Sequence, residues 1–323
     1  MTIRLAARLV AASAVLALSA CGGGGGSSSF RPEPTPPPSP PPSPPPPPPQ
    51  AEAVTIFSNP TAQDYSSVGV WGNLGDLSSP PYSVDFTSVT NAESSQPKIR
   101  YTTDDYYEVQ LPGDGFSRLI HDDSIANPTS DNTVFELQSQ MSRSFIITGS
   151  RNSGYRYSEM AKWARPDLDF AQTIDMGFVA FGTPTLAGSV PVTGAASYLG
   201  QILGTTDMPA AACDCGFPIG VEGTVALNFN FAAGTLGGSM SVALSSGWGA
   251  VPVGDYNFVQ TVFSAGSTTY SGRFDTNLAG DNFFLGRFTG PTADETIGAW
   301  AVPFTFQNET HQAIGAWIAK RGQ

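Results

Sequence analysis

The chain is poor in charge, in cysteine and in histidine. Only 13% of its 323 residues are charged, and it holds three cysteines and two histidines. So few sulfur and imidazole ligands argue against a metal site built from Cys and His. Acidic residues outnumber basic ones by 27 to 15, for a formal net charge of −12. Such a surplus repels phosphate backbones, so nucleic acid is not expected as a partner.

Long apolar runs are also missing, and the stretch Leu9–Leu18, of about ten residues, fits a secretory signal but is too short to span a bilayer. Arg4 and Arg8 precede it, and Leu18-Ser19-Ala20-Cys21 follows. The latter resembles a bacterial lipobox, which implies a signal peptide over residues 1–20, cleavage before Cys21 and lipid acylation of Cys21. Gly22 in place of Asp implies sorting to the outer membrane. The alternative is an ordinary signal peptide with a coincidental cysteine.

The other two cysteines form the motif Cys213-Asp214-Cys215. Because exported proteins meet an oxidising environment, a small-ring disulfide is one reading of this motif. Two free thiols are the other. The two histidines, His121 and His311, lie far from it in the sequence, so metal binding is the weakest reading.

Residues 21–53 have the composition of a tether. Glycine and serine fill 22–29, and Pro32–Pro49 is almost entirely proline. Proline-rich segments adopt extended polyproline II, which at ~3.1 Å per residue gives a semi-rigid stalk about 50 Å long. A disordered spacer without a fixed reach is the alternative.

The remainder reads as all-β, since glycine (35), phenylalanine (20) and tyrosine (10) are abundant. Residues 54–175 hold short strand-like runs such as 83–87, 106–111 and 144–148, with a turn at Pro112-Gly113-Asp114-Gly115. We expect a β-rich lead domain over residues 54–175, separated only loosely, near Arg165-Pro166, from the region that follows. Its topology does not follow from the pattern.

Residues 176–323 alternate apolar and small or polar side chains in eight segments. The segments are 195–203, 225–231, 236–244, 256–263, 269–275, 282–288, 298–306 and 313–319. Eight consecutive strands remove their exposed edges most simply by closing, so we expect an eight-stranded antiparallel soluble β-barrel.

One stretch of this barrel region, residues 286–300, carries a family resemblance. Its fixed positions are Gly286, Phe288, Gly290, Pro291, Ala293, Glu295, Gly298 and Trp300. They resemble the Gly-x-Phe-Tyr-Gly-Pro-x-Ala-x-Glu-x-Gly-Gly-x-aromatic signature of the transferrin-binding-protein B-like barrel domain. Thr289 replaces the second aromatic and Ile297 the first glycine of the pair. The ending 313–321 is similar to the last strand of factor-H-binding lipoproteins, which share this barrel.

The signature residues are expected to be structural. Gly290 and Pro291 set a turn, Ala293 packs beneath it, and Glu295 accepts hydrogen bonds from backbone N–H groups otherwise unpaired there. Asp294 and Glu295 are a poor acid–base pair, because adjacent residues of a strand point to opposite faces. We expect neither catalysis nor a bound cofactor.

The resemblance implies a lipoprotein of the outer membrane, displayed on the cell surface, that binds a protein partner through loops and the lead domain, often in iron or haem uptake. Exposed lead-domain aromatics such as Trp71 and Tyr106 are candidate contacts. A barrel that holds haem or an apolar solute in its mouth, with His121 or His311 near the iron, is the small-ligand alternative. A purely structural envelope lipoprotein and a lipid-anchored hydrolase are the others.

Overall fold

A computed structural model describes residues 60–74, 85–90, 96–121, 132–137, 140–148, 154–167, 173–208, 219–246 and 249–322. Within these ranges the chain forms eighteen strands and no helix, as the composition predicted. No helix of the described residues is therefore long and apolar enough to cross a membrane. The expected signal peptide, Cys21, the tether and the Cys213–Cys215 motif lie outside the described residues.

Ten strands form the first sheet, here called the lead sheet. They are β1 (Gln63–Asp64), β2 (Ser66–Leu74), β3 (Asp85–Thr90), β4 (Lys98–Tyr101), β5 (Tyr107–Gln110), β6 (Phe116–His121), β7 (Asn132–Leu137), β8 (Gln140–Thr148), β9 (Ser158–Asp167) and β10 (Thr173–Gly182). Their order is β1-β4-β5-β6-β7-β8-β9-β10-β2-β3, and every pairing is antiparallel.

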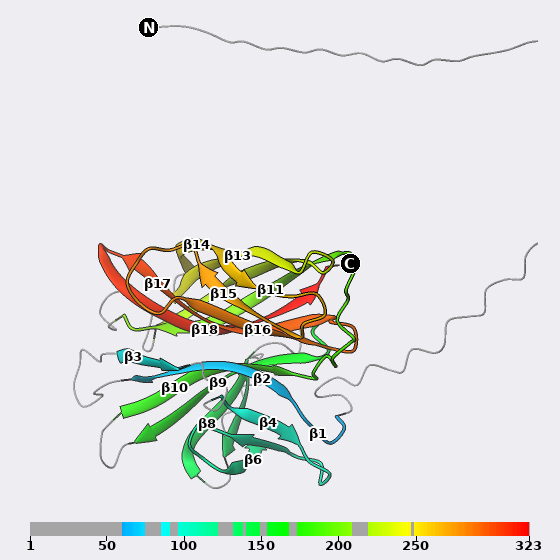
Figure 1. Cartoon of the computed structure of the whole chain (residues 1–323). Helices are drawn as coiled ribbons and strands as arrows, with labels where there is room; N and C mark the ends of the chain where they lie inside the picture. The colour runs from blue at the N-terminus through cyan, green and yellow to red at the C-terminus, as the bar shows by residue number, and fades with distance from the viewer. Residues whose placement is uncertain are drawn as a thin grey trace, which may run out of the picture. The chain divides into compact units, whose positions relative to one another are not determined.

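The lead sheet curls on itself because one continuous segment, β1 followed by β2, pairs with strands at opposite ends of the remaining sheet. Tyr65 alone separates β1 from β2, yet β1 pairs with β4 and β2 pairs with β10. The Tyr65 amide also donates to the Ile99 carbonyl, at 3.0 Å. The enclosed face buries an apolar core that includes Val109, Phe145 and Trp163. Figure 1 shows β4, β6 and β8 bending away from β2 and β10 around this core.

Eight strands form the closed barrel. They are β11 (Ala195–Thr206), β12 (Gly220–Asn230), β13 (Thr235–Ser246), β14 (Gly249–Val262), β15 (Thr269–Phe274), β16 (Phe283–Thr289), β17 (Glu295–Phe306) and β18 (Glu309–Arg321). Each pairs with the next along the chain, and β18 returns to β11 (Figure 1). Every predicted segment corresponds to one of these strands, so the all-β class and the eight-stranded barrel are confirmed.

The expected division between lead domain and barrel at 175/176 falls inside β10. That strand pairs with β9 on one side and β2 on the other, so all of it belongs to the lead sheet. The first barrel strand begins at Ala195. β10 is apolar on both faces, with Phe178 in the layer against the barrel and Val179 in the lead-sheet core, so its sequence does not mark the division.

The barrel interior is filled by side chains. Aromatic rings dominate it, and Phe229 alone contacts four others with ring centroids 4.8–5.9 Å apart, Tyr198, Phe231, Tyr270 and Phe288. Phe263 adds a fifth at 5.2 Å. The interior-facing residues are buried throughout. The small-ligand alternative needs a lumen that can hold a solute. The described residues of the barrel interior do not enclose one.

A second apolar layer joins barrel and lead sheet. Its barrel side consists of Ile297, Ala299 and Ala301 of β17 with Ile314, Ala316 and Ile318 of β18, all fully buried. Its lead-sheet side consists of Val68, Val70, Met160, Met176, Phe178 and Ala180. β17 and β18 therefore bury both of their faces, whereas the sequence pattern predicted one mixed face for every barrel strand.

Candidate protein-interaction site

The turn between β16 and β17 holds the signature residues, and it is tightly built. Gly290 has a φ of 82° and Ala293 a φ of 56°, both left-handed. Ala293 is fully buried, and its carbonyl accepts a hydrogen bond from the Tyr198 hydroxyl at 2.5 Å. Pro291 is exposed. A left-handed conformation is unusual for alanine, and full burial leaves no room there for a larger side chain.

Glu295 connects this turn to the lead domain. Its Oε1 accepts the backbone N–H of Arg156 at 2.6 Å, and its Oε2 accepts that of Tyr157 at 3.0 Å. The side chain is 4% exposed. Burial raises the pKa of the Glu295 carboxyl, and the two N–H bonds lower it by less. The donors belong to the segment before β9, not to the turn itself as the sequence suggested.

Asp294, the neighbouring acid, accepts hydrogen bonds from other groups. Its carboxylate accepts the amide and hydroxyl of Thr292, at 3.1 and 2.9 Å. Because Glu295 and Asp294 bond to separate groups on either side of the turn, the structure does not bring them together as an acid–base pair.

Both departures from the family signature lie where the barrel meets the lead sheet. The Thr289 hydroxyl lies 2.6 Å from that of Ser158 at a buried site. Ile297 is fully buried in the layer between β17 and the lead sheet. Gly298 and Gly286 keep the signature glycine because a Cβ would lie 2.1 Å from the Trp317 ring and 2.2 Å from the Tyr270 ring, respectively.

His311, the histidine whose side chain is described, lies beside two carboxylates. His311 lies on β18 with its Nδ1 3.5 Å from Asp207 and its Nε2 3.9 Å from Glu309. Burial raises the pKa of Asp207, while the Gln312 N–H and His311 oppose that rise. His121 ends β6, and its side chain lies outside the described residues. In the described part of the chain no three acidic, His or Cys side chains gather to hold a metal.

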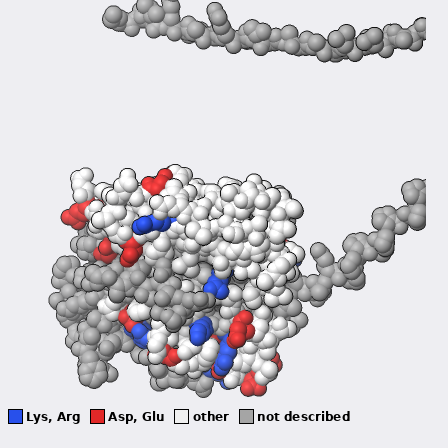
Figure 2. Space-filling model, viewed as in Figure 1, with Lys and Arg blue, Asp and Glu red and all other residues white. Residues whose placement is uncertain are grey.

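The face of the lead sheet that points away from its enclosed core carries a cluster of charged and aromatic side chains. The barrel packs on this face over β2, β9 and β10. Among the described residues, the barrel layer does not extend over β4, β5 and β6, where the side chains on this face are exposed or half-buried. We call the uncovered part the arginine–aromatic face. It consists of Lys98, Arg100, Tyr106, Glu108, Phe116 and Arg118. At the lower right of Figure 2, blue and red atoms lie side by side over these strands.

Strand register aligns its charges in a row of alternating sign. Asp64 pairs with Arg100, Arg100 with Glu108, and Glu108 with Arg118. Directly opposed residues in an antiparallel pair are close enough to interact, and opposite charges there stabilise the pairing by about 0.2–1 kcal/mol each. Their alternation sets the positions of the side chains across four strands.

The two arginines are held flat by aromatic rings. The Arg100 guanidinium lies 3.9 Å from the Phe116 ring centroid, and its Nε donates to Glu108 at 2.6 Å. The Arg118 guanidinium lies 4.4 Å from the Tyr106 ring centroid. Such stacking contributes roughly 0.5–1 kcal/mol at an exposed site. It also reduces the side-chain freedom that a binding partner would otherwise have to restrict.

The lead-domain aromatics named from sequence separate into two kinds. Tyr106 is half-buried and lies on the arginine–aromatic face. Trp71 packs beside the lead-sheet core, with its ring 6.1 Å from that of Trp163, so it is a core residue. Sequence reasoning missed Arg100, Phe116 and Arg118. The feature of the sequence that could have located these residues was period-two alternation in three short runs separated by turns.

Comparison with known proteins gives matches to solved structures alone. No protein-family model matches the chain, and no curated sequence does. A variant of transferrin-binding protein B from Haemophilus parasuis matches over 82% of this chain and 46% of its own, at 14% identity and a TM-score of 0.40. The isotype 1 protein from serogroup B Neisseria meningitidis matches over 80% and 43%, at 14% identity and 0.40.

The chain is similar to transferrin-binding protein B. These structures belong to the family that residues 286–300 resemble, and this chain spans just under half the length of those two proteins. A structure described as a surface lipoprotein is covered completely, over 81% of this chain, at 14% identity and a TM-score of 0.37.

Proposed function

We propose that this protein is a lipid-anchored lipoprotein of the outer membrane, displayed at the cell surface, that binds a protein partner through the arginine–aromatic face. The lipobox-like sequence before Cys21 supports the anchor, and the proline-rich tether supports display away from the membrane. The single observation that carries the binding role is the ordered stacking of Arg100 and Arg118 on an uncovered sheet face.

Three properties of this face match those of protein interfaces. Arginine and tyrosine dominate interaction hot spots, and both gather here. Phe116 is 36% exposed, which is unusual for so large an apolar ring. The sheet beneath is rigid, because the opposite face of β4 and β5 packs into a core with Ile99 and Val109.

An iron-carrying or haem-carrying protein is the first partner to test, because the signature at 286–300 resembles that of transferrin-binding proteins. The purified protein is immobilised and a panel of such carriers is passed over it, apo and loaded. Arg118→Ala and Tyr106→Ala should each weaken the captured complex by roughly tenfold, about 1–2 kcal/mol.

Arg321→Ala serves as the matched control, since Arg321 is an exposed arginine at the end of β18 in the barrel. It should leave capture unchanged. Equal losses in Arg118→Ala and Arg321→Ala would point to non-specific charge attraction. Undiminished capture by the Arg118 and Tyr106 variants would place the interface elsewhere, and no capture of any carrier would favour a purely structural lipoprotein.

A further inference from the structure

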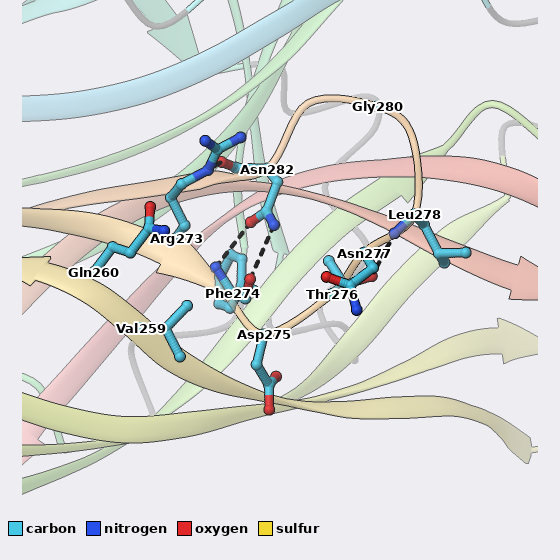
Figure 3. Close-up of a pocket in the computed structure, with 10 residues that line it drawn as sticks. All are labelled: Val259, Gln260, Arg273, Phe274, Asp275, Thr276, Asn277, Leu278, Gly280 and Asn282. Atoms are coloured by element: carbon cyan, nitrogen blue, oxygen red, sulfur yellow. Dashed lines mark hydrogen bonds between the residues drawn. The ribbon is translucent and has the colours of Figure 1, made fainter.

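A groove on the outside of the barrel combines a residue in a strained conformation with several polar side chains. It lies between β14, β15 and the loop joining β15 to β16, and has a volume of about 490 Å³. Figure 3 shows Gln260 and Arg273 on one side and Asn277 with Leu278 on the other, with Asn282 between them. The volume falls within the ~300–1,000 Å³ common for small-ligand sites.

A β-bulge places Gln260 on this groove. The pairing of β14 with β15 runs from Val259↔Arg273 to Val262↔Ser271, which leaves two residues of β14 opposite Gly272. Gln260 has a φ of 48°, a left-handed conformation rare outside glycine and asparagine. Bulges redirect side chains, and residues in sparsely populated conformations concentrate at functional sites. Gln260 is exposed, so core packing does not explain its conformation.

The groove is held rigid by its own hydrogen bonds. The Arg273 Nε donates to the Asn282 carbonyl at 3.1 Å, which fixes the plane of the guanidinium and leaves its two terminal nitrogens toward solvent. The Asn282 amide in turn donates to the Phe274 carbonyl at 2.9 Å and accepts the Phe274 N–H at 2.8 Å. The terminal nitrogens of Arg273 are therefore already oriented before a ligand arrives.

The groove is lined by one base, Arg273, and one acid, Asp275. Asn257 satisfies both carboxylate oxygens of Asp275, from the backbone N–H at 2.7 Å and from Nδ2 at 2.6 Å. In Figure 3 the Asp275 side chain points away from Arg273. Arg273 is thus free to pair with an anion from outside.

We infer that this groove binds a carboxylate-bearing saccharide, of the uronic acid class. The planar guanidinium of Arg273 matches a carboxylate through two parallel hydrogen bonds. The amide of Gln260, on the same side of the groove as Arg273, offers both a donor and an acceptor for ring hydroxyls. Val259 and Leu278 supply aliphatic surface for the C–H groups of the ring. This site is separate from the arginine–aromatic face and does not depend on the proposed function.

Two sugars that differ in one group test the inference. Methyl β-glucuronide and methyl β-glucoside, which carries a hydroxymethyl group in place of the carboxylate, are titrated into the full-length protein by calorimetry. Saturation-transfer NMR of the sugars follows weak binding. The glucuronide should bind at least about tenfold more tightly, since one charge-assisted bidentate pair distinguishes them.

Three variants separate the site from general charge effects. Arg273→Gln should remove the preference for the glucuronide. Gln260→Gly should weaken both sugars without loss of thermal stability, because glycine suits a φ of 48°. Arg321→Gln, at an exposed arginine beyond the opposite end of the barrel, should change neither. No saturable binding, equal affinity for both sugars, or a preference that survives Arg273→Gln would each overturn the inference.

Discussion

Replacement of Glu295 tests how barrel and lead domain are joined. Glu295→Ala removes the acceptors of two backbone N–H groups, those of Arg156 and Tyr157. A fully buried donor left without a partner costs about 1–3 kcal/mol, and the cost is smaller here because Arg156 is exposed and Tyr157 half-buried. Removal of the buried carboxylate offsets part of that loss. Its burial is unfavourable, because the burial that raises its pKa outweighs the hydrogen bonds that lower it. We therefore expect a net loss of roughly 1–3 kcal/mol in the free energy of unfolding.

Glu295→Gln keeps the volume and one acceptor but turns an NH₂ group toward the second N–H. It should destabilise the protein as well, and it removes a titrating group. Because the folded-state pKa is raised above 4.5, the carboxyl contributes its full stability below about pH 4.5 and loses part of it as pH rises through the folded value. The stability difference between wild type and Glu295→Gln should therefore shrink from pH 4 toward neutral.

Urea denaturation followed by tryptophan fluorescence at several pH values measures both effects. Glu222→Gln is the control, because Glu222 is an exposed glutamate on β12. A loss within about 0.5 kcal/mol of that control would show that the two N–H bonds add nothing to stability. A stability difference that grows toward neutral pH would refute the sign of the pKa argument.

Three further outcomes are expected. Cys21→Ser should abolish acylation and leave an uncleaved or soluble form, and mass spectrometry showing an unmodified mature Cys21 in the wild type would contradict the anchor. Gly298→Ala should destabilise by several kcal/mol, since its Cβ would lie 2.1 Å from the Trp317 ring, whereas Gly237→Ala meets nothing within 4 Å and should be nearly neutral. Residues 51–323 should melt in one calorimetric transition because a buried apolar layer joins their two sheets, and two separated transitions would refute that coupling.

The barrel could be predicted from sequence because its signals are local. Period-two alternation in strands such as Val225–Phe231 is set by the pleat, in which successive side chains point to opposite faces. Consecutive antiparallel strands then leave closure as the simplest topology. The turn within residues 286–300 could be predicted for the same reason, since Gly290, Pro291 and Ala293 act within a few residues of one another.

One signal in the sequence was present but misread. Residues 297–304 and 313–319 are nearly unbroken apolar runs, which indicates strands buried on both faces. Read as alternating strands with one mixed face, they gave no hint of a covering layer. The structure shows the lead sheet in that place, packed on Ile297 and Ile314.

Only the tertiary structure decided which distant residues meet. Glu295 finds its donors 138 and 139 positions away, and the arginine–aromatic face requires the register of β4, β5 and β6. Register in these short strands depends on their shared core, including Val109 and Leu119, and not on any motif. The sequence by itself determined the barrel strands, and it predicts the tether and the anchor, because each arises from neighbouring residues. The sites arise from pairings across the chain, whose free energy belongs to the folded assembly as a whole.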